Sequence, residues 1–309
     1  MDTIAVLMTK PEHLLLQRVD LLPPGAADVV VHVEWSGIST GTEKLLWLGR
    51  MPNFPGMGYP LVPGYESVGR IVQAGPESGH RIGSRVFIPG SRGFRDVRGL
   101  FGGAAEHLVT AGARVIPVDE SLGDKAILLA LAATSYHAIA DHPPELIIGH
   151  GVLGRLLARI TIAMGHPAPN VWELDVDRAD GAQGYNVLAP DDDARRDYGR
   201  ICDASGDSSI LDQLVGRLRS GGEITLAGFY DRLSFAFAPA FMREVTLRIA
   251  AEWQAQDMAA LHALLAAGTL SLDNLITHRE AAGDAPDAYR TAFGDARCLK
   301  MVLDWRKQG

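Results

Sequence analysis

The spacing of hydrophobic and polar residues changes part-way along the chain. Up to about residue 118, short runs of β-branched residues, such as 29–35 and 66–72, stand between stretches dense in Gly and Pro. This pattern predicts strands. From about Leu122, apolar residues at helical spacing alternate with short apolar runs. Alternating strands and helices predict a parallel, doubly wound sheet, so the fold class is α/β.

The second pattern predicts individual elements. Its clearest helices are 155–164 and 210–219, the latter ending at the pair Gly221 and Gly222. Its predicted strands are 146–148, 171–174, 199–203, 223–228 and 244–251. The last of these is the expected edge of the sheet, and we expect it to pair in a homodimer.

The length of 309 residues suits two domains. Past about Leu270 the chain leaves the alternating pattern, so its end is expected to rejoin the first part. We therefore predict a β-rich catalytic domain from residues 1–118 and 270–309. A dinucleotide-binding domain is predicted from residues 119–269.

Composition and charge exclude several classes of function. The net charge of −8 leaves no basic surplus for nucleic acid. No run approaches the roughly 20 apolar residues that span a bilayer, and the first residues do not resemble a signal peptide. Cys202 and Cys298 are the only cysteines, so a disulfide framework is not expected. We expect a cytoplasmic protein without nucleic-acid partners or integral membrane association.

A glycine turn follows the predicted strand 146–148. It reads G-H-G-V-L-G, with glycines at Gly149, Gly151 and Gly154. The first glycine permits a tight turn, the second lets a pyrophosphate approach the backbone, and the third lets the helix pack on the strand. Free N–H groups at Val152 and Leu153 would attract phosphates. The pattern predicts a dinucleotide site, although a purely structural turn would also fit it.

An acid about 20 residues beyond this turn would accept the adenosine ribose hydroxyls. Glu173 lies 19 residues after Gly154 and Asp175 lies 21 after it. Either carboxylate would repel a 2′-phosphate, so NAD is the expected cofactor. Arg178 nearby leaves NADP open.

Two histidines stand close to these motifs. His137 lies in a helical apolar run, where a hydrogen-bonded structural role is favoured over catalysis. His150 occupies the variable second position of the glycine turn. It could touch a cofactor, but we do not assign it as the base.

The series of short motifs along the chain resembles the medium-chain dehydrogenase/reductase superfamily. The residues that carry the resemblance are 37–39, 63–69, 103–107, 134–138, 149–154, 203–206 and 218–222. It implies a GroES-like catalytic domain joined to a Rossmann domain. We add Ala204, Ser205 and Gly228, at the ends of the later predicted strands, to the expected cofactor site.

The chain differs from the zinc-dependent members of this superfamily at the positions of the metal ligands. Those members have Cys where this chain has Ser39 and His where it has Tyr65, and a further Cys or acid is expected near Ala130. Zinc needs three protein ligands of these kinds. The segment 91–103 also lacks the cysteines of a structural zinc lobe. We therefore predict a member without metal.

Oxidation of an alcohol without zinc requires another acceptor for the hydroxyl proton. Our hypothesis makes Tyr65 this acceptor, with Glu66 or Lys44 tuning its pKa, which a cation or an extended network would have to lower. Thr42 would hold substrate or the nicotinamide ribose, and Ser39 belongs to the same polar cluster. Alternatively, Tyr65 and Glu66 only support the loop.

Three runs, 35–43, 56–66 and 298–305, are similar to a branch of this superfamily that acts on chlorins. That similarity implies NAD-linked oxidation of the C3 1-hydroxyethyl group of a (bacterio)chlorophyllide to an acetyl group in bacteriochlorophyll biosynthesis. A flat macrocycle needs apolar and aromatic surface. Such surface could come from Trp47, Met51, Phe54, Met57 and Tyr59, unless these side chains only pack their loop.

Two other functions remain open. A zinc-free NAD(P)H-dependent reductase of quinones or enoyl compounds would also lack the metal ligands. A non-catalytic NAD-binding sensor would keep the glycine turn but show no turnover. The polar cluster around Ser39 and Tyr65 favours an enzyme over the sensor.

Overall fold

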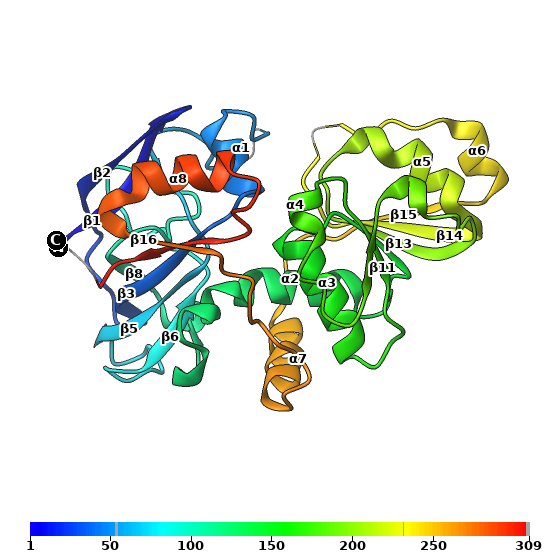
Figure 1. Ribbon diagram of the computed structural model, residues 1–309. Helices are drawn as coiled ribbons and strands as arrows, with labels where there is room; N and C mark the ends of the chain where they lie inside the picture. Colours follow the sequence, from blue (N-terminus) through cyan, green and yellow to red (C-terminus); the bar gives the residue numbers. More distant parts are fainter. Residues whose placement is uncertain (53–54, 231, 307–309) are drawn as a thin grey trace. The chain divides into compact units, whose positions relative to one another are not determined.

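The structure is a computed structural model that describes residues 1–52, 55–230 and 232–306 (Figure 1). The chain forms two compact units. The first unit holds residues 1–130 and the chain from 275 onward, and the second holds residues 131–274. The domain limits given above stay a prediction.

The first unit contains two sheets. The smaller runs in the order β2 (His13–Asp20), β1 (Asp2–Lys10), β4 (Leu61–Val62) and β7 (Arg98–Gly99). The larger runs in the order β16 (His278–Ala281), β17 (Met301–Asp304), β3 (Asp28–Ile38), β5 (Ser67–Ala74), β6 (Arg85–Ile88) and β9 (Ile116–Pro117), with β8 (His107–Ala111) also paired to β3. Helix α8 (Ala285–Gly294) packs against β2 and β17.

The long strand β3 organises this unit. It pairs antiparallel with β5 on one side and with β17 on the other, so Met301 lies opposite Ile38. Its valines at 29, 30, 31 and 33 are fully buried in the core. The pairing places a segment near residue 300 beside one near residue 38.

The second unit is a six-stranded parallel sheet. Its order is β12 (Asn186–Leu188), β11 (Asn170–Trp172), β10 (Leu146–Ile148), β13 (Tyr198–Asp203), β14 (Leu218–Leu226) and β15 (Thr246–Ile249). Strand β10, which comes first in the sequence of this unit, lies inside the sheet. Strands β11 and β12 follow on one side of it and β13 to β15 on the other, which is the doubly wound topology. The predicted α/β class is confirmed, and β15 is an edge strand as expected.

The helices of the chain are mostly short. Their bounds are α1 (Thr42–Trp47), α2 (Leu129–Ile139), α3 (Val152–Ala163), α4 (Val176–Ala179), α5 (Leu211–Arg217), α6 (Phe237–Met242), α7 (Ala255–Ala266) and α8. Single-turn 3-10 segments lie at 112–114, 190–192, 208–210 and 282–284, and a longer one at 120–128 precedes α2. Within the described ranges, no helix is long and apolar enough to cross a membrane.

One predicted helix end is wrong. Helix α5 ends at Arg217, and β14 begins at the next residue. The register of β14 against β13 shifts between Leu218 and Glu223, so the intervening residues form an irregularity in the strand. Gly221 has φ +70 there, and its N–H donates to the carbonyl of Arg243. The glycine pair therefore serves a strand irregularity, not a helix terminus.

Candidate functional site

A pair of hydroxyl groups lies at one end of the larger sheet in the first unit. Strands β3 and β5 are paired up to Ser36 and Ser67, so the residues just beyond them, Ser39 and Tyr65, meet at the same end. Ser39 Oγ and Tyr65 Oη are 2.7 Å apart and hydrogen bonded. The ring of Phe101 meets the Tyr65 ring edge-on, at 5.6 Å between centroids.

The environment of Tyr65 opposes ionisation. Burial and the neighbouring Glu66 raise the pKa of the phenol, while hydrogen bonds with Ser39 and Thr42 act weakly in the other direction. The Nζ of Lys44 donates to the carbonyl of Phe293. An effect of Lys44 on the pKa of Tyr65 stays a prediction, and the phenol stays protonated at neutral pH.

The carboxylate of Glu66 forms an ion pair that the hypothesis did not include. Its Oε2 accepts from Lys300 Nζ at 2.5 Å, and the ammonium also donates to the carbonyl of Ile38 at 3.2 Å. Glu66 is 0% exposed and Lys300 1%. Glu66 thus pairs with a buried lysine, and its charge raises the pKa of Tyr65. A lysine inside the apolar run around Met301 was the signal in the sequence, since buried lysines need a partner.

A second buried carboxylate supports the loop that carries Ser39. Glu43 Oε1 accepts from the main-chain N–H of Ser39 at 3.0 Å, and its Oε2 accepts from the hydroxyl of Tyr289 at 2.7 Å. Burial raises the pKa of Glu43 to about 7. Glu43 therefore positions Ser39 and changes charge near neutral pH. Tyr289 was not among the predicted catalytic residues.

The raised pKa of Glu43 predicts a pH-dependent stability. The unfolded state releases this proton near the usual pKa of 4.5, whereas the folded state holds it to about 7. Glu43 should therefore remove roughly 3 kcal/mol of stability as the pH rises through this window. Urea unfolding of the wild type and of Glu43→Gln, compared at pH 5 and pH 8, measures the difference. Glutamine mimics the protonated carboxyl, so parallel pH profiles of the two proteins would refute the prediction.

The three positions of the expected zinc ligands hold hydroxyl and methyl groups. Ser39 and Tyr65 bond to each other, and Ala130 is buried in α2. In the described part of the chain, no group of three or more His, Cys, Asp or Glu side chains is placed to hold a metal ion.

The glycine turn joins β10 to α3 in the second unit. Gly149 has φ +92, which favours glycine. A Cβ on Gly154 would lie 1.8 Å from the carbonyl oxygen of Gly149, whereas one on Gly151 would meet nothing within 4 Å. No side chain caps α3, so the N–H groups at Val152 and Leu153 are available to an anion. The turn thus fits a pyrophosphate.

Of the two candidate acids, Glu173 belongs to this turn. Its Oε2 accepts from the N–H of His150 at 2.9 Å, and its Oε1 accepts from the N–H groups of Leu174 and Asp175. The Asp175 carboxylate instead caps the N-terminus of α4. Arg178 lies in α4, with its carbonyl toward His150.

The ends of three parallel strands meet beside the turn. The N–H of Ala204 donates to the carbonyl of Ile148 at 3.0 Å, and Ser205 approaches Gly149. The N–H of Gly228 donates to the carbonyl of Asp203 at 3.1 Å. The tertiary structure therefore places Ala204, Ser205 and Gly228 where strands β10, β13 and β14 end.

Other candidates have structural contacts. His137 Nδ1 bonds Asp257 Oδ2 at 2.9 Å, as expected of a hydrogen-bonded histidine. In the long loop, Met51 is buried in the core. Trp47, Met57 and Tyr59 are partly buried against the same core, and Phe54 lies outside the described residues. Packing accounts for these four side chains.

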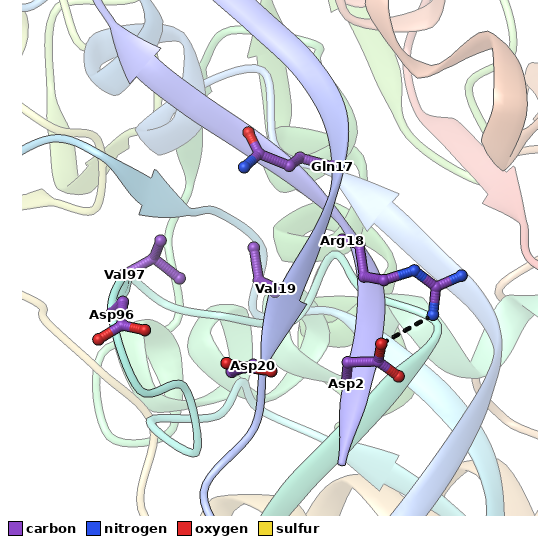
Figure 2. Close-up of a pocket in the computed structure, with 7 residues that line it drawn as sticks. All are labelled: Asp2, Gln17, Arg18, Val19, Asp20, Asp96 and Val97. Carbon is purple, nitrogen blue, oxygen red and sulfur yellow. Dashed lines mark hydrogen bonds and ion pairs between the residues drawn. The ribbon is translucent and has the colours of Figure 1, made fainter.

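A surface pocket lies elsewhere on the first unit (Figure 2). It is lined by Asp2, Gln17, Arg18, Val19, Asp20, Asp96 and Val97. Arg18 pairs with Asp2 at 2.9 Å, and both side chains are solvent exposed. None of the predicted site residues contributes to it, so we assign it no role in the chemistry.

The chain is similar to known dehydrogenases over its full length. Residues 25–120 match the alcohol dehydrogenase GroES-like domain. The 2-desacetyl-2-hydroxyethyl bacteriochlorophyllide A dehydrogenase of Rhodobacter capsulatus is 57% identical over 311 residues, which covers 99% of both chains.

Two solved structures share the fold at lower identity. An alcohol dehydrogenase of Escherichia coli CFT073 complexed with NADH has a TM-score of 0.83 at 20% identity, over 98% of this chain and 99% of that one. A putative zinc-binding dehydrogenase of Sinorhizobium meliloti bound to NADP has a TM-score of 0.82 at 17% identity, with the same coverage. The chain therefore belongs to the medium-chain dehydrogenase/reductase superfamily, in the family of the 2-desacetyl-2-hydroxyethyl bacteriochlorophyllide A dehydrogenases.

Proposed function

We propose that this protein oxidises the C3 1-hydroxyethyl group of a bacteriochlorophyllide to an acetyl group, with NAD and without zinc, in bacteriochlorophyll biosynthesis. The observation that carries the proposal is the 57% identity to the R. capsulatus enzyme across both full chains. The hydroxyl pair of Ser39 and Tyr65, at two of the expected ligand positions, supports the metal-free mechanism.

The glycine turn and Glu173 would hold the cofactor. The N–H groups at Val152 and Leu153 would bind the pyrophosphate, and Glu173 would accept the adenosine ribose hydroxyls. The carboxylate charge of Glu173 favours NAD over NADP. When bound, NAD supplies the acceptor for the hydride that leaves the hydroxyethyl carbon.

The first unit would handle the hydroxyl proton. Because Tyr65 stays protonated, it can accept the substrate proton only while its own proton moves to Ser39 Oγ, and Ser39 would in turn pass its hydroxyl proton to water. Thr42, which also acts on the pKa of the phenol, would hold the substrate or the nicotinamide ribose beside it. Glu43 holds the main chain of Ser39 and so positions the relay.

Replacing Tyr65 with phenylalanine tests the relay. Without the phenol the proton has no positioned acceptor, so kcat for alcohol oxidation should fall by about 10²-fold or more. The ring and its contact with Phe101 remain but the buried hydrogen bond to Ser39 is lost, so the melting temperature should fall modestly without loss of the fold. Steady-state kinetics with the hydroxyethyl chlorin and NAD measures the effect. An unchanged kcat would remove Tyr65 from the chemistry.

A substrate panel tests the function itself. Purified protein is assayed with a hydroxyethyl bacteriochlorophyllide and NAD, and separately with quinones or enoyl compounds and NADPH, alongside zinc analysis. Formation of the acetyl chlorin by zinc-free protein supports the proposal. Quinone or enoyl reduction alone would favour the reductase, and NAD binding with no turnover would favour the sensor.

A homodimer through β15 is part of the proposal. This edge strand leaves Ile249 71% exposed, and the nearby helix α6 exposes Phe237, Phe241 and Met242. Apolar side chains beside an open strand edge are suited to pairing with a second copy. Sedimentation should show a dimer for the wild type and a monomer for Ile249→Lys. A monomeric wild type at micromolar concentration would contradict the proposal.

A further inference from the structure

His150, the residue between the first two glycines of the turn, makes contacts in four directions. Its ring is fully buried. Nδ1 lies 2.6 Å from the carbonyl oxygen of Arg178, and Nε2 lies 2.8 Å from the hydroxyl of Tyr185. Its main-chain N–H donates to Glu173, and its carbonyl accepts from Arg155 Nε at 3.0 Å.

These contacts determine the tautomer of His150. A carbonyl oxygen can only accept, so Nδ1 carries the proton that is donated to Arg178. Burial, aided by the charge of Arg155, lowers the pKa of His150 to about 4, so the ring is neutral at physiological pH. Nε2 is therefore the acceptor for the Tyr185 hydroxyl.

Arg155 reinforces the same connection. Its Nη2 donates to the carbonyls of Arg178 at 2.9 Å and of Asp180 at 2.7 Å. It lies on α3 directly after the glycine turn and is 4% exposed. Two buried donors thus converge on the carbonyl of Arg178. The segment that follows Glu173 is tied to the turn that would hold the pyrophosphate.

We infer that His150 is a positioning residue that sets cofactor affinity and the preference for NAD over NADP. It holds Glu173 through its main chain and the segment 174–180 through its ring. The acid that receives the ribose must keep a constant distance from the turn that receives the phosphates. If the segment loosens, the carboxylate binds the ribose less well and repels a 2′-phosphate less. The inference rests on the proposed use of a nicotinamide dinucleotide.

Two variants separate positioning from a general loss of packing. In His150→Asn, the amide nitrogen takes the place of Nδ1 and can still donate to Arg178. In His150→Gln, the amide takes the place of Nε2 and keeps only the contact with Tyr185. Each variant loses one buried hydrogen bond, so their melting temperatures should fall by similar amounts.

Calorimetric titration of the full-length protein with NAD and with NADP measures the effect. We expect His150→Gln to raise the Kd for NAD by about tenfold. The ratio of the Kd for NADP to the Kd for NAD should become smaller than in the wild type. His150→Asn should stay within about threefold of the wild type. His166→Ala, outside the turn, is the control for histidine removal. Equal Kd values for the Asn and Gln variants would overturn the inference.

Nitrogen NMR of the wild type tests the geometry without any variant. The His150 ring should show a protonated Nδ1 and should not titrate between pH 5.5 and 8, with the signal identified by its loss in His150→Asn. A ring that titrates in this range would overturn the inference. Because binding is measured without substrate, NAD binding with no chlorin oxidation would refute only the proposed function. Failure of the wild type to bind either dinucleotide would refute the inference as well.

Discussion

Replacing Lys300 with methionine is expected to lower the free energy of unfolding by about 3–5 kcal/mol. The lysine is the ion-pair partner of Glu66, and both side chains are almost completely buried. Methionine fills a similar volume but leaves a buried carboxylate without its cation. Glu66 Oε1 already lacks a hydrogen-bond partner among the described residues, so no other group compensates. Urea unfolding at pH 8 measures the loss.

The double variant Lys300→Met with Glu66→Gln is the control for this experiment. It removes both charges, so it should recover more than half of the stability that the single variant loses. The loss in the single variant should also shrink at pH 5, because burial raises the pKa of Glu66 and a protonated carboxyl needs no cation. A loss below about 1 kcal/mol, or a double variant as unstable as the single one, would contradict the ion-pair interpretation.

Replacing Gly154 with alanine is expected to weaken NAD binding by roughly ten- to a hundredfold and to destabilise the protein by about 1–3 kcal/mol. The new Cβ would lie 1.8 Å from the carbonyl oxygen of Gly149, a main-chain atom that no side-chain rotation can move away. Helix α3 must therefore shift from β10, and the N–H groups at its start move with it. Calorimetric titration and thermal unfolding measure the two effects.

Two glycine variants serve as controls. Gly151→Ala meets nothing within 4 Å in the protein, so it should keep the melting temperature and lose only NAD affinity. Gly216→Ala in α5 also meets nothing and lies far along the chain from the turn, so it should bind NAD like the wild type. Wild-type affinity in Gly151→Ala would argue against pyrophosphate binding at the turn.

Local sequence patterns predicted much of the structure of the second unit. The change from a period of two to a helical period predicted a parallel sheet, because each strand and helix buries its own apolar face. The glycine spacing indicated a cofactor turn for a similar reason, since all its residues are close in sequence. The end of α5 was predicted wrongly because a glycine pair suits a strand irregularity as well as a helix terminus. Only the pairing of β14 with β13 distinguishes the two.

By itself, the sequence of this protein determined the α/β class and the glycine turn with an acid beyond it. These properties depend on residue type and local spacing, whereas the correspondence of Ser39 and Tyr65 to zinc ligands came from the resemblance to a family. The tertiary structure alone decided that Lys300 neutralises Glu66 and that Tyr289 reaches Glu43. Those contacts join residues more than 230 positions apart. The pairing of strands brings distant segments together and so decides which charged groups are buried side by side. Those neighbours in turn determine the protonation state of each group.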